Sequence, residues 1–323
     1  MRRRSFLRLV GGAAALGPIV ARAQEAGRHA RVGVLVLAQA DGDSLVKILR
    51  SSLGTIGYTE GQNLEFHVRA AIGAVGRLDQ LAAELVELKV DLMLATFTPC
   101  ALAARRATGT IPIVAISVAD PIGSGLAGSL SKPGGNVTGL TNLAAETAGK
   151  GVEMLRDAFP RIRQVAAIAN PEDPFTKPFL EHVRAAGSVS GVEIGPIAMV
   201  RRPDDFENAF ATIVAGKAEA VIVQGIFFSK PIADLAIRHR LPTASVVRAF
   251  AEVGGLITYG ASVPDLFQRS AYFVQKILQG SKPADLPIEQ PTQFELAINL
   301  RTAKAIGVTI PESLLLRASA VIE

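Results

Sequence analysis

The chain has 323 residues, enough for one large domain or two of ordinary size. Hydrophobic residues make up 49% and charged residues 20%. This balance predicts a globular protein with a sizeable core and excludes intrinsic disorder, collagen-like repeats and coiled coils. The single cysteine, Cys100, excludes an internal disulfide and a cysteine-rich metal site. The four histidines lie far apart in the sequence and form no zinc-binding pair, so we expect no metal site.

The charge of the chain is concentrated at its N-terminus. Residues 1–23 carry five arginines and no acidic residue. Without them, the 34 basic residues fall to 29, which equals the number of acidic residues. The body of the chain therefore has no excess positive charge, and we expect no nucleic-acid partner.

The same N-terminal segment has the pattern of an export signal. A basic start precedes an apolar stretch at residues 9–20, and Ala21-Arg22-Ala23 is a small-x-small cleavage site. The apolar stretch is shorter than the roughly 20 residues that span a bilayer. We predict that residues 1–23 are a cleaved signal and that the mature protein is periplasmic. The pair Arg3-Arg4 resembles the twin-arginine export motif, and the ordinary secretory route stays open.

The body alternates strand-length apolar runs with helical spacing. Apolar faces of helical period occur at residues 45–56 and 78–88, and later at 264–279. The strand-length runs are residues 31–37, 91–95, 111–118, 164–169, 218–224 and 255–259. Such alternation predicts βαβ units, hence parallel sheets with helices on both faces. About five units precede Thr141 and about three lie between residues 164 and 247, which favours two α/β lobes over one long sheet.

Two local patterns resemble enzyme motifs. Glycines at positions 123, 125 and 128 match the spelling of a dinucleotide-binding loop. The preceding Asp120-Pro121 separates them from the strand and would repel a pyrophosphate, so we interpret the glycines as the start of a helix. Ser129 and Lys132 have the spacing of an acyl-serine enzyme, whose partner motifs the chain lacks. We therefore expect no cofactor and no enzymatic activity.

Polar side chains gather where the predicted strands end. Ligands of parallel α/β sheets lie beyond the carboxyl ends of strands, where helix N-termini can hold a carboxylate and an acidic side chain can hold an ammonium group. Glu172, Ser245 and Arg248 lie at such ends. The predicted ligand-binding residues are Gln39, Asp41, Thr96, Thr98, Asp120, Thr141, Asn142, Asn170, Gln224, Phe227 and Tyr259. The alternative interpretation of each Thr, Asn and Asp is a helix cap or a turn residue.

Four stretches carry a resemblance to a known family: LGTIGYTEGQN (53–63), SKPGGNVTG (131–139), GGLITYG (254–260) and QPTQFELAINLRTAKAIG (290–307). They resemble the periplasmic substrate-binding proteins of ABC transporters, specifically the relatives of tryptophan- and tyrosine-binding proteins. The resemblance implies a type I periplasmic-binding-protein fold, with two Rossmann-like lobes joined by three crossing segments. It also implies a first lobe of residues 30–141 plus 260–284 and a second of residues 142–259 plus 285–323.

The function that the resemblance implies is solute capture. We expect a monomer that closes by a hinge on a small, amino-acid-like molecule and delivers it to an ABC permease in the inner membrane. Two alternatives remain open: a ligand sensor that acts on a membrane receptor, and an exported enzyme.

Overall fold

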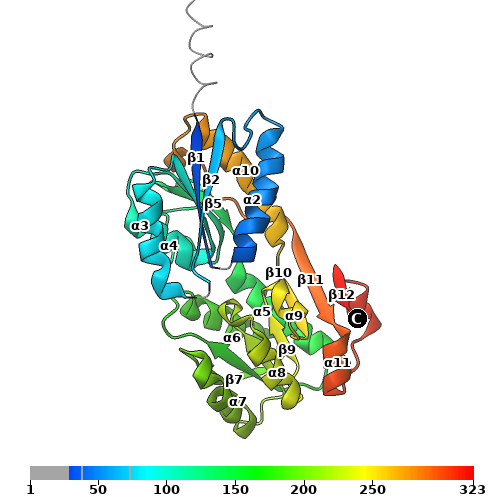
Figure 1. Cartoon of the computed structure of the whole chain (residues 1–323). Coiled ribbons are helices and arrows are strands. Elements are labelled where there is room, and N and C mark those ends of the chain that lie inside the picture. Colours follow the sequence, from blue (N-terminus) through cyan, green and yellow to red (C-terminus); the bar gives the residue numbers. More distant parts are fainter. Residues whose placement is uncertain (1–28, 38, 73) are drawn as a thin grey trace, which may run out of the picture.

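The chain folds into two lobes, each built around its own β-sheet, in a computed structural model that describes residues 29–37, 39–72 and 74–323 (Figure 1). The predicted two-lobed α/β fold is confirmed. The predicted signal at residues 1–23 lies outside the described residues. Among the described residues, no helix combines the length and apolar character needed to cross a bilayer.

The first lobe contains a five-stranded sheet in which every neighbouring pair is parallel. Across the sheet the strands are β2 (Leu64–Ala70), β1 (Ala30–Val36), β3 (Leu92–Thr96), β4 (Ile113–Val118) and β5 (Val137–Thr141). One face is covered by α2 (Gln39–Gly54) and α10 (Val263–Leu278), the other by α3 (Leu78–Glu87) and α4 (Phe97–Ala107).

Alternate residues of the central strands supply both faces of this core. Val32 and Val34 of β1 pack toward α2 and α10, whereas Leu35 packs toward α3 and α4. A strand with helices on both sides needs apolar residues at successive positions, which explains the nonalternating runs of the sequence. The half-exposed edge strand β2 shows no such run, and the sequence did not assign it.

The second lobe contains a seven-stranded sheet that is parallel except at one pair. Across the sheet the strands are β12 (Ala320–Ile322), β11 (Phe294–Asn299), β10 (Ile257–Ala261), β9 (Thr243–Ser245), β8 (Ala220–Val223), β6 (Gln164–Ala169) and β7 (Glu193–Met199). On one face lie α5 (Ala144–Ala158) and α6 (Thr176–Ser190), and on the other α7 (Phe206–Ala215), α8 (Lys230–Arg238) and α9 (Arg248–Glu252). The chain closes with α11 (Leu300–Ile306) and α12 (Glu312–Leu315).

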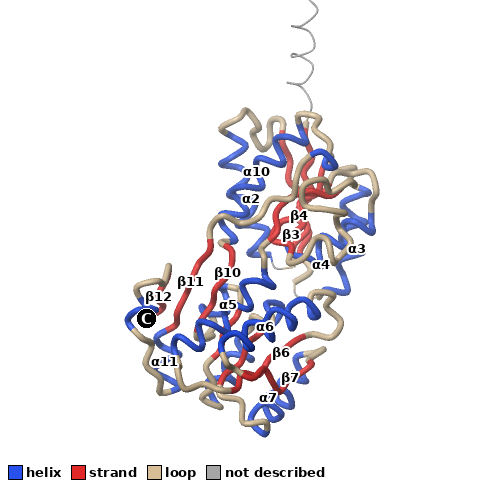
Figure 2. The backbone as a smooth tube through the Cα atoms, turned by 180° about the vertical axis from the view of Figure 1, so that it is seen from behind, coloured by secondary structure: helices blue, strands red, loops and turns tan. Residues whose placement is uncertain are grey.

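The chain passes between the lobes three times. It leaves β5 for α5, leaves β10 for α10 through Ser262, and returns into β11 (Figure 2). Since β10 runs toward the first lobe and β11 runs back, this pair is antiparallel. The crossings are bonded to one another: the Ser262 N–H donates to the Gln293 carbonyl at 3.0 Å, and the Thr141 N–H to the Glu289 carbonyl at 2.9 Å.

The lobe boundaries stay a prediction, to which the contacts add detail. The strand-length run at residues 255–259 overlaps β10, and the chain leaves the second sheet at Ser262. Residues 286–289 hydrogen-bond with β5 of the first lobe. Arg269 of α10 holds Glu289 through two hydrogen bonds of 2.7 Å, so the third crossing stays attached to the first lobe up to that residue.

The glycines between β4 and β5 do not begin a helix, so this expectation was wrong. They form consecutive turns, with Gly125 in the left-handed region at φ +73°. The guanidinium of Arg105, on α4, donates to the Gly125 carbonyl at 3.0 Å and to the Leu126 carbonyl at 3.1 Å. These side-chain donors occupy carbonyls that a helix would have paired internally.

Candidate functional site

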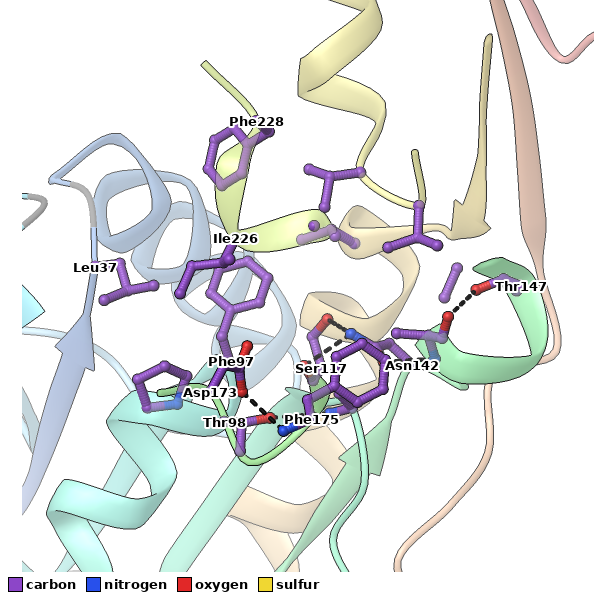
Figure 3. Close-up of a pocket in the computed structure, with 18 of the residues that line it drawn as sticks. Leu37, Phe97, Thr98, Ser117, Asn142, Thr147, Asp173, Phe175, Ile226 and Phe228 are labelled. Carbon is purple, nitrogen blue, oxygen red and sulfur yellow. Dashed lines mark hydrogen bonds between the residues drawn. The ribbon is translucent and has the colours of Figure 1, made fainter. Parts of the chain in front are cut away.

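A pocket lies between the two sheets, where the carboxyl ends of their strands face each other (Figure 3). The first lobe contributes the segments that follow β1, β3 and β4, and the second contributes the start of α5 and the segments after β6, β8 and β9. The crossing from β10 to α10 completes the wall. The lining residues are Leu37, Phe97, Thr98, Pro99, Ser117, Ala119, Asn142, Ala144, Thr147, Asp173, Phe175, Gly225, Ile226, Phe228, Val246, Val247, Arg248, Ala261 and Val263.

Two of the sequence-predicted ligand residues, Thr98 and Asn142, line this pocket. Thr98 is in the first turn of α4, and its hydroxyl oxygen accepts a hydrogen bond from the Ala119 N–H at 3.1 Å. The Asn142 amide donates to the carbonyl of Ser117 at 3.0 Å and to its hydroxyl oxygen at 3.1 Å. These contacts tie the ends of β3, β4 and β5 into one wall.

Three other predicted residues of the first lobe lie outside the pocket wall. Thr141 is buried, and its hydroxyl donates to the Val118 carbonyl at 2.8 Å. Asp120 accepts from the Gly123 N–H at 2.8 Å, as a turn residue does. The hydroxyl of Thr96 is buried without a partner among the described residues. Gln39 and Asp41 lie in the first turn of α2, and their side chains are outside the part of the chain that the structure describes.

Both predicted aromatic residues pack against other rings. Phe227 is buried against Phe206, with ring centroids 5.9 Å apart in an edge-to-face arrangement. Tyr259 stacks on Phe294 across the β10–β11 pair, with centroids 5.8 Å apart. Neither ring is part of the pocket wall, whereas the neighbouring Phe228 is. Ile226 and Phe228, on either side of Phe227, line the pocket, whereas Phe227 packs into the core of the second lobe.

The remaining two predicted residues, Asn170 and Gln224, support the wall from behind. Gln224 is buried, and its Oε1 accepts from the Asn170 N–H at 2.7 Å. Its Nε2 donates to Oδ2 of Asp173 at 2.8 Å. Asp173 lines the pocket and also accepts from the Phe175 N–H at 2.9 Å. Burial raises the pKa of the Asp173 carboxyl, and the Phe175 N–H offsets part of that rise.

The pocket contains a second charged side chain, Arg248 at the start of α9. The sequence placed Arg248 at a strand end, and the structure places it in the wall. Its guanidinium donates to Glu295 at 2.8 Å and to Glu252 at 3.3 Å. The hydrogen bond with Glu295 raises the pKa of Arg248, which is therefore always cationic. These two carboxylates neutralise the arginine, which leaves Asp173 as the lining charge without a cationic partner among the described residues.

Sequence reasoning missed the apolar part of the wall and a cluster of strained backbone. Phe97, Phe175 and Phe228 were passed over because apolar residues beside a strand end are ordinarily core. Phe97 and Ser117 have φ of +61° and +63°, in the left-handed region that non-glycine residues rarely adopt. Such backbone costs about 1–3 kcal/mol per residue and concentrates at functional sites.

Two hydroxyls on residues that line the pocket from the first lobe each have a proton to donate. A hydroxyl has one proton and two lone pairs. The oxygens of Thr98 and Ser117 each accept from an N–H group, and neither donates its proton to a described residue. The first turn of α4, which carries Thr98, also leaves backbone N–H groups without intrahelical partners. The first lobe therefore presents hydrogen-bond donors to the pocket, and the second presents the Asp173 carboxylate.

The pocket does not have the make-up of a metal centre. Within the residues that the structure describes, no three His, Cys, Asp or Glu side chains come together as metal ligands. Cys100 is buried in the core of the first lobe, among α3, α4 and the sheet. The wall instead combines aromatic rings, hydroxyls and one acid, which suits an organic solute.

Two α/β lobes joined by three crossings, with a pocket between them, define a binding protein of the type I periplasmic architecture, and solved structures of that architecture match the chain. The family of ABC transporter substrate-binding proteins matches residues 31–322, and the chain belongs to this family. Its members bind small-molecule solutes and work with a membrane permease.

Several relatives are similar over most of the chain. A tyrosine-binding protein of Clostridioides difficile is 26% identical over 78% of this chain and 73% of its own. The structure of an ABC domain in complex with L-Trp from Streptococcus pneumonia is 26% identical, with a TM-score of 0.83 over 91% of this chain and 100% of the other. A conserved domain protein from Vibrio cholerae is 27% identical, with a TM-score of 0.84 over the same shares.

Proposed function

We propose that this protein is the solute-binding component of an ABC importer and captures an aromatic amino acid between its lobes. It is exported, acts outside the cytoplasmic membrane as a monomer, and binds without chemical conversion. The observation that carries the proposal is the polarity of the pocket: donors line one lobe and a carboxylate lines the other. An amino acid has the complementary pair of charges.

The carboxylate of the solute belongs against the first lobe. The Thr98 and Ser117 hydroxyls can each donate to it, and the N-terminus of α4 favours a negative charge. The ammonium group belongs against Asp173 of the second lobe. A hydrogen bond to a charged group contributes about 1.5–3 kcal/mol, so a few such contacts account for tight binding.

The side chain of the solute belongs among the phenylalanines. Phe97 comes from the first lobe, and Phe175 and Phe228 come from the second (Figure 3). Aromatic pairs prefer edge-to-face or offset contacts, which contribute about 0.5–1.5 kcal/mol beyond the burial of apolar area. The relatives named above, a tyrosine-binding protein and a complex with L-Trp, support an aromatic solute.

Closure follows from the division of the site between the lobes. A solute that contacts both lobes stabilises the closed form, because its affinity for the two states differs. A shift from 1% to 99% closed needs about 5.5 kcal/mol of differential binding. The closed form is then the one that the permease recognises.

Isothermal titration of the mature protein with tryptophan, tyrosine and phenylalanine tests the proposal. We expect binding of one molecule per chain and a smaller radius of gyration in solution scattering. Leucine and aspartate are the control solutes for the aromatic pocket and for the charge of the site. Absence of binding by all three aromatic amino acids would refute the proposal. Uptake of the bound amino acid by a deletion strain then separates transport from sensing.

A further inference from the structure

Gln224 has a side-chain orientation that its surroundings determine. It is 1% exposed and lies behind the pocket wall. The backbone N–H of Asn170, 2.7 Å away, can only donate, so the atom that faces it must be the oxygen Oε1. The Thr176 hydroxyl lies 3.2 Å from the same oxygen. The amide Nε2 must therefore point the other way, toward Asp173.

The consequence for Asp173 is that both of its oxygens face donors. Oδ2 accepts from the Gln224 amide at 2.8 Å, and Oδ1 accepts from the Phe175 N–H at 2.9 Å. Hydrogen bonds donated to a carboxylate stabilise its ionised form, so both donors oppose protonation of Asp173. Each oxygen retains a further lone pair, and the carboxylate lines the pocket. A partly buried acceptor with this geometry discriminates between solutes that supply a donor and solutes that do not.

We propose that Gln224 is a positioning residue that holds Asp173 as an ionised acceptor, and that the pocket therefore selects solutes with an ammonium group. This inference rests on the proposed function and deepens it. The sequence predicted that Gln224 contacts the solute directly. In the structure its side chain is almost completely buried and donates to Asp173, which lines the pocket.

Two ligands that differ only in the ammonium group measure this selection: tryptophan and its des-amino analogue, 3-(indol-3-yl)propanoate. The measured quantity is the ratio of their dissociation constants for the mature protein. In the wild type we expect tryptophan to bind at least about tenfold more tightly, the lower end of the range for a charged hydrogen bond. Equal affinities would overturn the inference and leave amino-acid binding intact. If neither ligand binds, tyrosine or phenylalanine and its des-amino analogue take their place, and absence of binding by all three amino acids would overturn the proposed function itself.

The role of Gln224 is measured by a double-mutant cycle with Asp173. Gln224→Met keeps the size of the side chain and removes its hydrogen bonds, and we expect the ratio to fall about tenfold. Asp173→Asn is expected to lower it at least as much. In the double variant the ratio should equal that of Asp173→Asn within about twofold, because Gln224 then has no carboxylate to hold.

Additive effects in the cycle, or a ratio unchanged by Gln224→Met, would overturn the positioning role. A merely structural role would weaken both ligands equally and leave the ratio where it was. The matched control is Gln80→Met on α3, where an exposed amide donates to Glu84 at 3.3 Å, and its ratio should equal the wild-type value. If Gln224→Met does not fold, Gln224→Glu, which keeps an acceptor for the Asn170 N–H, goes through the same cycle with the same expected non-additivity.

Discussion

Thr96 and Thr98 lie two positions apart at the junction of β3 and α4, and the structure assigns them opposite roles. Both are almost completely buried. Thr98 lines the pocket and its oxygen accepts from the Ala119 N–H. Thr96 is outside the pocket wall, and its hydroxyl has no partner among the described residues. Valine has nearly the shape of threonine, so Thr→Val at each position isolates the hydroxyl.

Thr98→Val should weaken both ligand binding and the fold. Loss of one donor to the carboxylate of the solute costs about 1.5–3 kcal/mol, which lowers the affinity roughly 10- to 150-fold. The Ala119 N–H also loses its acceptor, and an unpaired buried donor costs about 1–3 kcal/mol of unfolding free energy. Thr96→Val removes an unpaired hydroxyl instead, so we expect unchanged affinity and a small gain in stability.

Titration calorimetry with the bound amino acid and urea denaturation of the ligand-free protein measure the two effects. The decarboxylated amine of the same amino acid is a further probe, because it has no carboxylate for Thr98 to contact. Its affinity should be the same for Thr98→Val and wild type. Equal losses of amino-acid affinity in Thr96→Val and Thr98→Val would refute the assignment of donors to the first lobe.

Three further predictions follow from burial, charge and backbone geometry. Because burial raises the pKa of Asp173 above 3.8, the folded chain holds that proton more tightly than the unfolded chain. The contribution of this group to the stability of the ligand-free protein should therefore fall as the pH rises from about 3.8 through the folded-state pKa. A difference in Tm between wild type and Asp173→Asn that did not vary with pH would contradict this. Phe228→Ala should weaken aromatic solutes with little change in stability, whereas Phe227→Ala should cost about 3–5 kcal/mol of unfolding free energy, as measured in urea. Gly139→Ala should abolish soluble expression, since φ is +135° there and an added Cβ would lie 1.9 Å from the Ala115 carbonyl oxygen; normal yield would show that β4 and β5 can separate.

The candidate site was predicted in its general position and only partly in its residues. The rule that ligands bind beyond the carboxyl ends of parallel strands led to Thr98 and Asn142, which line the pocket. It led equally to Thr141 and Asp120, whose side chains bond within their own lobe. A polar residue at a strand end is needed both for caps and for ligands, and the sequence pattern is the same for both.

Sequence reasoning could not identify Asp173 as a pocket residue. Nothing local marks it, because Glu172 beside it is also acidic and also follows β6. Glu172 is exposed and pairs with Arg201 at 3.4 Å, whereas Asp173 turns inward to Gln224, a residue 51 positions later. Only the pairing of β6 with β8 brings those two segments together.

The sequence by itself determined the alternation of strands and helices and the division into two lobes, because apolar period and run length are local properties of the chain. The sequence also identified the family, because the family model matches residues 31–322. The tertiary structure decided which side chains face the pocket, because that depends on the direction of each strand end and on partners far away in the sequence. The tertiary structure also decided the antiparallel pairing of β10 with β11, because the chain crosses to the first lobe after β10 and returns in β11.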